Sequence, residues 1–434
     1  MRKKIISLIL LFSALHAQTL QDALEDMLET NPTIQERLNN YKVTNIDIKS
    51  AKSGYYPKID LMVAGGKEKT DRDYMNVTYD VYQSSIKYTQ NLFNGFNTTH
   101  LVDEEEFRTV AAAYSYIEKV NSLAFDLASA YLEVIKNQKL LDISKENVTI
   151  DEEILSKVKK LYKFGLTTLS EVNKVESSLA LAKSNYIVQE NTLLNASYNL
   201  EKLLGKRVKA HEMVKPTLQS SLFPKRKEEA LETALKNNPS LIVSNYNIEL
   251  AKSTKKAAEA NYYPKVDIEL AQTYNHNLGG SYGKNDVSSA MIYLSYNLFS
   301  GFGDEAAIEK ALVKTAQENN NKNILKREVI QSLNLAWTAR EKLNEQLLHL
   351  KKYKEFSNKT LQLYTKEYDL GRRSLLDLLS AQNDFIQSRA QIITTQYSIL
   401  YAEYKILSTM GVLVDTIMGN SEKLYNRVAI KKEK

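Results

Sequence analysis

The 434-residue chain carries the same series of short motifs twice, 206 or 207 residues apart. The matched motifs are Leu-Glu-Thr-Asn-Pro at 28–32 with Leu-Lys-Asn-Asn-Pro at 235–239, Tyr-Tyr-Pro-Lys at 55–58 and 262–265, Asn-Leu-Phe-Asn-Gly-Phe at 91–96 with Asn-Leu-Phe-Ser-Gly-Phe at 297–302, and single glycines at 165 and 371 and at 205 and 411. A fixed offset over so many motifs indicates a tandem duplication, so both halves must fold into copies of one unit.

Five segments follow from this repeat. Residues 1–17 begin with Arg2-Lys3-Lys4, continue through a short apolar stretch and end at Ala17, which is the pattern of a secretory signal peptide. We expect the first structural repeat at 18–205 and the second at 227–413. A linker at 206–226 carries two prolines, and residues 414–434 form a C-terminal tail.

The six prolines predict where helices begin and end. Pro32 and Pro239 are expected at helix starts, whereas Pro57 and Pro264 end a helix and open extended chain. No proline follows Pro57 until the linker, and none follows Pro264. Helices are therefore expected at 33–55, 97–164 and 166–204, with counterparts in the second half.

The long helix of the first half has an apolar seam of the coiled-coil type. Its apolar positions are spaced alternately three and four residues apart, which places them on one helix face. The second half shows the seam less cleanly. The seam residues are Ile117, Val120, Ala124, Leu127, Tyr131 and Val134, and in the second half Ile330, Leu333 and Trp337.

Between the proline and the Asn-Leu-Phe motif of each half, apolar and polar residues alternate, as in Ile59, Leu61 and Val63. This pattern predicts two strands of about ten residues per half, joined as a hairpin. Four strands per chain leave open edges, which lipid does not allow. Membrane barrels begin at about eight strands, so at least two chains must combine, and 8, 12 or 16 strands all fit. Tyr88, Tyr293 and Tyr296 are expected at the membrane interface.

Composition excludes several classes of function. The chain has no cysteine, which excludes disulfides, cysteine-ligated metals and cysteine nucleophiles, and its five histidines lack ligand spacing, so we expect no metal or cofactor site. A formal net charge of +6 without a basic block gives no reason to expect nucleic acid as a partner.

Two segments formally match enzyme motifs. Residues 279–283 satisfy G-x-S-x-G, but they lie in a polar hairpin turn rather than between a strand and a helix. Residues 301–306 satisfy G-x-G-x-x-A, but no second parallel strand follows within a dinucleotide-binding unit. We therefore predict that the protein is not an enzyme.

The duplicated halves, the Tyr-Tyr-Pro motif before a strand, the Asn-Leu-Phe-Ser-Gly-Phe motif and the two glycine-centred helical turns resemble the TolC outer-membrane efflux protein family. The resemblance covers residues 19–413, and the segment 368–382 around Gly371 is its most diagnostic part. It implies a mainly α-helical fold with a membrane β part: a homotrimer with a 12-stranded β-barrel, four strands per chain, on a long periplasmic α-helical barrel.

The resemblance also implies which residues act at the periplasmic tip. A gating network would consist of Glu171, Tyr368 and Arg373, with the arginine of one helix pair contacting the carboxylate of the neighbouring pair. Asp377 would form a selectivity ring. Ser380 stands where the best-known member has a further carboxylate, so a second acidic ring is not expected. The tips expected to dock an adaptor are Gly165, Leu166, Thr167, Gly371, Arg372 and Ser374.

The function implied by the resemblance is an outer-membrane exit duct, serving a tripartite efflux pump or type I secretion. Its partners would be outer-membrane lipid, a periplasmic adaptor (membrane fusion protein) and an inner-membrane RND or ABC transporter. The alternative is a periplasmic coiled-coil adaptor or scaffold. The two predicted hairpins favour the duct, because such adaptors lack two widely separated hairpins of this kind.

Overall fold

The computed structural model describes residues 19–218 and 223–429, so the predicted signal peptide at 1–17 lies outside the described residues. These residues form two compact units, each built from separate stretches of sequence. The first unit holds the described residues up to 35 together with 118–238 and 328–424. The second holds 36–117, 239–327 and the described residues from 425 onward.

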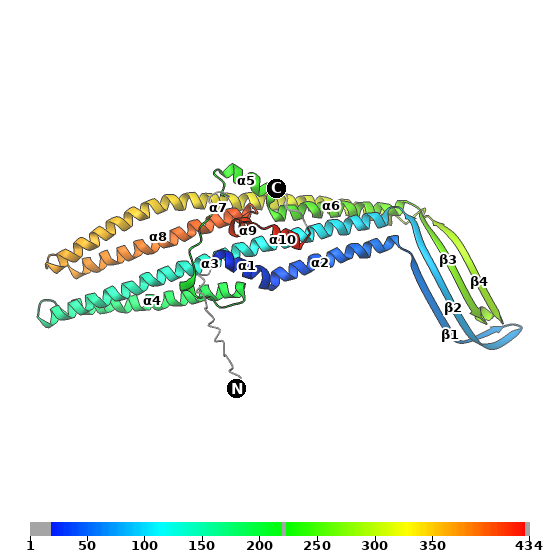
Figure 1. The fold of residues 1–434 in the computed structure, drawn as a ribbon, viewed down its shortest axis with the longest axis horizontal. Helices are drawn as coiled ribbons and strands as arrows, with labels where there is room; N and C mark the ends of the chain where they lie inside the picture. Colours follow the sequence, from blue (N-terminus) through cyan, green and yellow to red (C-terminus); the bar gives the residue numbers. More distant parts are fainter. Residues whose placement is uncertain (1–18, 219–222, 430–434) are drawn as a thin grey trace, which may run out of the picture. The chain divides into compact units, whose positions relative to one another are not determined.

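Each half of the sequence follows the predicted order of helix, two strands, long helix and shorter helix (Figure 1). A short helix precedes this series in both halves, and two further short helices follow the second. The first half contains α1 (Leu20–Thr30), α2 (Pro32–Lys52), β1 (Lys58–Arg72), β2 (Met75–Asn94), α3 (Asn97–Lys163) and α4 (Leu169–Leu204). The second half contains α5 (Lys227–Asn237), α6 (Pro239–Glu259), β3 (Lys265–His276), β4 (Lys284–Ser295), α7 (Gly303–Asp369), α8 (Leu375–Thr409), α9 (Leu413–Met418) and α10 (Glu422–Arg427).

The proline predictions are confirmed, and the residue before each helix-starting proline explains the repeat of the Asn-Pro motif. Pro32 begins α2 and Pro239 begins α6. Asn31 donates a side-chain hydrogen bond to the Leu203 carbonyl near the end of α4, at 3.1 Å. Asn238 does the same to the Thr409 carbonyl at the end of α8, at 2.9 Å. Each asparagine thus satisfies a helix C-terminal carbonyl that has no partner within its own helix.

The predicted seam of the long helix is buried along its whole length. All six positions from Ile117 to Val134 expose less than a tenth of their surface. In the second half Leu333 and Trp337 are buried as well, whereas Ile330 is half-buried.

Residues of the linker lie against these helices in the first unit. The Tyr131 hydroxyl on α3 donates to the Val214 carbonyl at 2.8 Å and accepts from the Val214 N–H at 3.1 Å. Phe223 stacks on Trp337 of α7, with ring centroids 6.2 Å apart, and the Arg340 guanidinium lies 4.6 Å above the Phe223 ring. Burial raises the pKa of Tyr131 to about 12, so its hydroxyl stays protonated and keeps both bonds at physiological pH.

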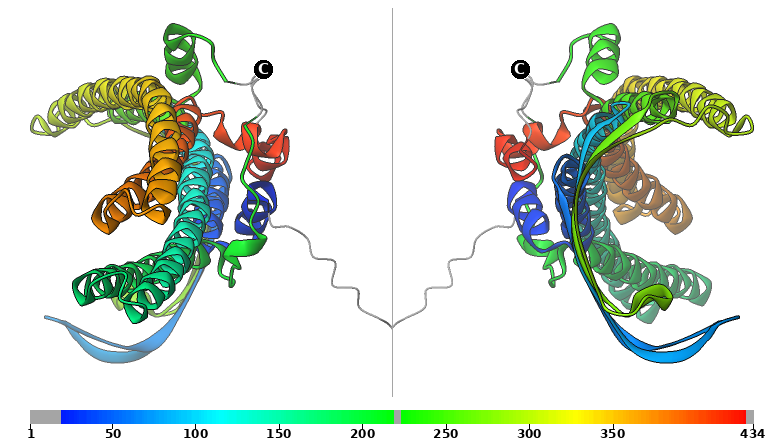
Figure 2. Two further views of the ribbon diagram at one scale, coloured as in Figure 1. Left: turned by 90° about the vertical axis from the view of Figure 1, so that its left-hand side faces the viewer. Right: turned by 90° about the vertical axis from the view of Figure 1, so that its right-hand side faces the viewer.

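The four strands form one antiparallel sheet in the order β1-β2-β3-β4 and curve together as a strip (Figure 2). Because β2 pairs with β3, the two repeats are joined in the middle of the sheet. The outer edges of β1 and β4 have no neighbouring strand among the described residues. Every backbone N–H and C=O group on those edges needs a partner from elsewhere.

The first hairpin is longer than predicted. Strands β1 and β2 have 15 and 20 residues, and β3 and β4 have 12 each, so the prediction of about ten was wrong for the first pair. Apolar alternation stops near Val63, and the Gly, Lys, Glu and Thr residues after it have the composition of a loop. The pairing nevertheless continues from Lys67 opposite Asp80 to Arg72 opposite Met75.

One face of the sheet is apolar and the other is polar. Residues directly opposite in the register share a face. The apolar face includes Leu61 opposite Ile86 and Ile268 opposite Ile292. Leu61 exposes 73% of its surface and Ile292 exposes 71%.

The opposite face carries Asp60 across from Lys87, and Lys87 bonds Glu269 at 2.5 Å. Tyr88 lies on the apolar face, as expected for an interfacial tyrosine, since it pairs with Ile59 and Leu270. Tyr293 instead pairs with Asp267 on the polar face, so its place at the lipid interface stays a prediction. An exposed apolar face of this size indicates contact with lipid or another apolar partner.

Gly95 ends β2 where the chain turns into α3, and it cannot be replaced by a residue with a side chain without displacing its neighbours. Its φ is +68°, a left-handed conformation that favours glycine. A Cβ atom there would lie 2.3 Å from the Ala260 carbonyl oxygen and 2.9 Å from the Tyr263 Cβ. Gly301, its counterpart in the second repeat, has φ +67° and nothing within 4 Å of an added Cβ.

This difference predicts unequal effects of the same substitution. Gly95→Ala and Gly301→Ala should both incur about 1–2 kcal/mol of backbone strain. Only Gly95→Ala must also displace backbone, which should bring its total cost to about 3 kcal/mol or more. Thermal unfolding of the purified variants measures the gap, and equal losses at the two positions would contradict the close approach of Gly95 to Ala260 and Tyr263.

Candidate functional site

Two glycine turns end the long helices and share one backbone geometry. Gly165 after α3 has φ +69°, and Gly371 after α7 has φ +70°. At the first turn the Gly165 N–H donates to the residue three positions back, and the next N–H donates five positions back, both at 2.9 Å. The second turn repeats these bonds at 3.0 and 2.8 Å. This paired pattern is the Schellman motif, in which a left-handed residue closes a helix.

The helices that follow the turns are capped in equivalent ways. Thr168 caps α4 by accepting from the Glu171 N–H at 3.3 Å, and Ser374 caps α8 by accepting from the Asp377 N–H at 3.2 Å. The two acidic side chains accept hydroxyl hydrogen bonds in return, Glu171 from Thr167 and Asp377 from Ser374. The predicted gate carboxylate and the predicted ring carboxylate are therefore repeat equivalents, each in the first helical turn where the helix dipole favours negative charge.

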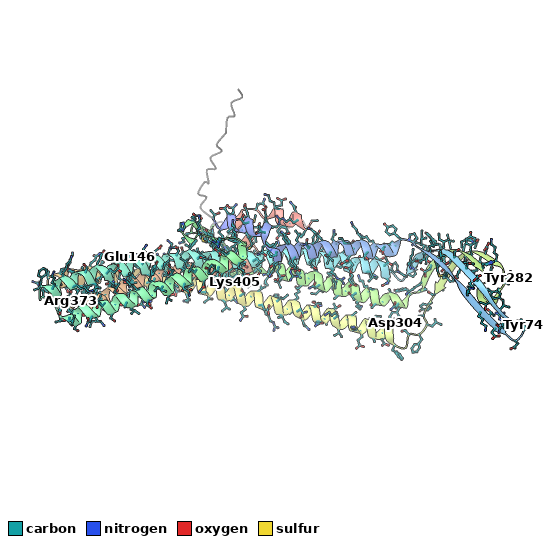
Figure 3. All side chains as sticks on the ribbon, turned by 90° about the horizontal axis from the view of Figure 1, so that it is seen from below. Tyr74, Glu146, Tyr282, Asp304, Arg373 and Lys405 are labelled. Atoms are coloured by element: carbon teal, nitrogen blue, oxygen red, sulfur yellow. The ribbon has the colours of Figure 1, made fainter. Side chains whose placement is uncertain are left out.

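Arg373 is held inside its own turn. Its Nε and Nη2 atoms both lie 2.8 Å from Glu367 Oε2, and its guanidinium stacks 4.1 Å above the Tyr364 ring. Asp377 lies 3.8 Å from its Nη1 atom. The hydrogen bond with Glu367, opposed by burial, raises the pKa of Arg373. Figure 3 labels Arg373 at this end of the helical unit.

Tyr368 brings the two helical hairpins of the tip together. Its half-buried ring packs against a cluster contributed by α3, α4 and α8, and Lys157 of α3 lies 5.6 Å from the ring centre while also pairing with Asp369. Burial first, then the nearby charges of Glu171 and Asp369, raise the pKa of Tyr368. The cluster consists of Val158, Val172, Val175, Leu375 and Leu379, with Ile154 and Leu155 beside it.

Of the predicted gating residues, the structure brings Tyr368 near Glu171 and directs Arg373 to Glu367 and Tyr364. The contact of Arg373 with Glu171 was expected between neighbouring helix pairs of an assembly, and it stays a prediction. Sequence reasoning missed Glu367, Tyr364 and Lys157. The first two lie shortly before Arg373, at the end of α7, so a search for partners along the adjoining helix could have found them.

The two turns also expose large apolar side chains. Phe164 is 76% exposed, Leu166 72% and Leu370 69%. The predicted docking residues lie among them: Gly165, Leu166, Gly371, Arg372 and Ser374 are exposed, and Thr167 is half-buried. Clustered exposed apolar side chains mark interaction surfaces.

The other sequence motifs give no site. Residues 279–283 lie in the turn between β3 and β4, without the helix that a nucleophile elbow requires. Within residues 19–218 and 223–429, no group of three or more histidine, aspartate or glutamate side chains could hold a metal ion. In the same part of the chain no helix is long and apolar enough to span a membrane.

The sequence matches the family model described as outer membrane efflux protein, once at residues 23–206 and again at 230–412. The chain belongs to the outer membrane efflux protein family. Members reside in the outer membrane and act in efflux, and the double match agrees with the tandem repeat found in the sequence.

Individual relatives agree with this assignment. The outer membrane efflux protein BepC of Brucella suis is 19% identical over 404 residues, which cover 93% of this chain and 87% of BepC. The outer membrane protein TolC of Vibrio cholerae is 19% identical over 413 residues, covering 93% of each chain. The solved structure of the Campylobacter jejuni CmeC outer membrane channel superposes with a TM-score of 0.82 at 13% identity, covering 94% of this chain and 89% of CmeC.

The cap of α8 gives a local test of the tip geometry. Ser374→Ala removes the side-chain acceptor of the Asp377 N–H, a loss of about 1 kcal/mol. Amide hydrogen exchange in the first turn of α8 should therefore accelerate by about fivefold. Ser380→Ala, at an exposed position further along α8, is the matched control. Unchanged exchange in Ser374→Ala would contradict the capping role.

Proposed function

We propose that three copies of this chain form a passive outer-membrane exit duct, which carries molecules from the periplasm to the exterior without catalysis. The observation that carries the proposal is the sheet, with four strands, two edges unpaired among the described residues and one exposed apolar face. In lipid an unpaired edge costs several kcal/mol per backbone group. Pairing β4 of one copy with β1 of the next removes every edge and leaves the apolar face toward lipid.

Twelve strands agree with the polar face of the sheet. In a closed barrel this face lines the interior, so Asp60, Lys87 and Glu269 border a water-filled lumen. Eight or sixteen strands would also close the edges, and the trimer is the state that the family resemblance implies. The alternative of a periplasmic scaffold gives no role to the exposed apolar face.

The helical tips supply the docking surface for the partners. A periplasmic adaptor would bind around Phe164, Leu166 and Leu370, whose exposed side chains suit an apolar contact. An inner-membrane RND or ABC transporter would deliver the cargo through it. The cargo depends on the transporter, because a wide aqueous duct need not bind the molecules that pass through it.

The closed state of the duct depends on contacts between neighbouring helix pairs at the tip. Arg373 of one helix pair contacts Glu171 of the neighbouring helix pair, next to Tyr368. Within one chain Arg373 already holds Glu367 and stacks on Tyr364, so its guanidinium is presented in a fixed orientation. A planar guanidinium can bond two carboxylates at once, which makes a second bond across the interface compatible with the first.

Assembly can be tested on the mature protein. We expect it to require detergent and to run as a trimer in analytical ultracentrifugation, because an isolated copy would leave both sheet edges unpaired. A monodisperse monomer that stays in solution without detergent would rule out the duct.

The gate can be tested in planar bilayers. Arg373→Ser with Tyr368→Phe should raise the open population, since each exposed ion pair contributes ~0.5–1 kcal/mol and three copies up to ~2 kcal/mol, or about thirtyfold. Asp377→Ala should keep the resting aperture but weaken cation selectivity. Exchanging the charges with Arg373→Glu and Glu171→Arg should restore closure. If this exchange conducts as much as either single reversal, the two residues do not pair.

A further inference from the structure

A buried carboxyl group joins three helices of the first unit, away from the turns. Asp151 of α3 is only 2% exposed. Its Oδ1 accepts from Gln382 Nε2 of α8 at 2.8 Å, and its Oδ2 accepts from the Ser178 hydroxyl of α4 at 3.1 Å. The α3/α4 hairpin and the α8 arm of the other hairpin therefore meet at one acidic side chain.

Among the described residues, no cation pairs with this carboxyl group. Burial raises the pKa of Asp151, and only the bonds from Gln382 and Ser178 oppose the shift. The charged groups along the same helix interfaces are already paired with one another and lie at the surface. They are Glu146 with Arg389 between α3 and α8 at 2.7 Å, Glu152 with Lys183 between α3 and α4 at 2.8 Å, and Lys159 with Glu176 between α3 and α4 at 2.7 Å.

Gln382, which donates to Asp151, has a buried oxygen atom that lacks a hydrogen-bond donor among the described residues. Its Nε2 donates to Asp151 and to Asn147 Oδ1 at 3.0 Å, while its buried Oε1 has no hydrogen-bond partner among the described residues. A buried acceptor without a donor costs free energy. If Asp151 were protonated, its hydroxyl could donate to Oε1 after rotation of the Gln382 amide, in exchange for the two bonds that Nε2 donates to Asp151 and Asn147. The cluster thus has two hydrogen-bonding arrangements, and the protonated one buries no charge.

We propose that Asp151, Ser178 and Gln382 form a proton-responsive joint that holds the α3/α4 hairpin to α8 more tightly when Asp151 is protonated. Its consequence for transport rests on the proposed duct. Acidification of the periplasm would stabilise the closed packing of these helices, and a rise in pH would favour their separation.

The direction of the pH effect follows from the thermodynamic linkage between proton binding and folding. An aspartate whose pKa is raised by folding contributes stability that is fully present below its ordinary pKa of about 4 and is lost as pH rises through the raised value. Glu146 behaves oppositely, because the hydrogen bond from Arg389 lowers its pKa. Its contribution to the free energy of unfolding is therefore lost only as pH falls below about 4.5. Ionisation of Asp151 therefore opposes folding, whereas ionisation of Glu146 favours it.

Asp151→Asn tests the joint, because asparagine keeps the shape and is neutral at every pH. Glu153→Gln is the matched control, since Glu153 is an exposed carboxylate two residues away on α3. Thermal unfolding of the detergent-solubilised protein from pH 5 to 8 should show a falling midpoint for the wild type. The midpoint of Asp151→Asn should fall less across this range than that of the wild type, because the variant has no carboxyl group to ionise at this position. Glu153→Gln should follow the wild type.

A second variant separates a charge effect from a packing effect. Gln382→Met keeps the volume but removes the donor that favours the ionised carboxylate, so the fall in midpoint should extend to higher pH and be larger than in the wild type. If Asp151→Asn keeps the wild-type pH dependence, or if Gln382→Met leaves the transition in place, the joint does not titrate and the proposal is wrong.

Bilayer recordings connect the joint to the duct. The wild type should open less often at pH 5 than at pH 8, whereas Asp151→Asn should keep the low open probability at both. Each unit by which the pKa differs between the closed and open states changes their ratio by tenfold. A wild type that forms no channels would refute the duct itself. Channels with identical pH dependence in the wild type and Asp151→Asn would refute only the joint.

Discussion

Unpaired backbone on the outer strands is the constraint on which the rest of this molecule depends. Strands β1 and β4 each leave one edge without a partner among the described residues. Water can satisfy such an edge, but lipid cannot, and the exposed side chains of Leu61 and Ile292 favour lipid on one face. A single copy therefore cannot have its strand edges hydrogen-bonded by water and its apolar face in lipid at the same time. Association with further copies through the edges, as in the proposed duct, would satisfy the backbone groups and leave the apolar face toward lipid.

The helical part shows the same internal duplication as the sheet. Each repeat contributes a hairpin of helices closed by the same Schellman turn, with a hydroxyl cap and an acidic residue at the start of the next helix. Glu171 and Asp377 stand at equivalent positions and stabilise their helix starts, in addition to any role in the assembly. The repeats differ at the residue just before the cap, which is Thr167 in the first repeat and Arg373 in the second. An assembly of identical repeats would have no such difference between its hairpins.

Buried polar groups in the helical part differ in how completely they are paired. Asn31 and Asn238 donate hydrogen bonds to helix carbonyls. Among the described residues, by contrast, the carboxyl group of Asp151 has no cation beside it, and the Gln382 Oε1 atom has no hydrogen-bond donor. An apolar contact at Asp151 would hold the hairpins together at every pH. A buried carboxyl group makes that contact conditional on a proton, at a cost in stability near neutral pH. Such a cost is reasonable if these helices separate during transport, as proposed for the duct.

Local sequence determined the elements of this protein. Prolines, glycines and heptad spacing set helix boundaries through the backbone alone, so the starts of α2 and α6 and the turns at Gly165 and Gly371 were predictable. The extension of β1 and β2 was not, because its polar residues are ordered by pairing across the hairpin. The partners of Arg373 and the cluster around Asp151 could not be predicted from the sequence either. The Asp151 contacts join residues up to 231 positions apart, and only tertiary packing decides which side chains meet and which are removed from water.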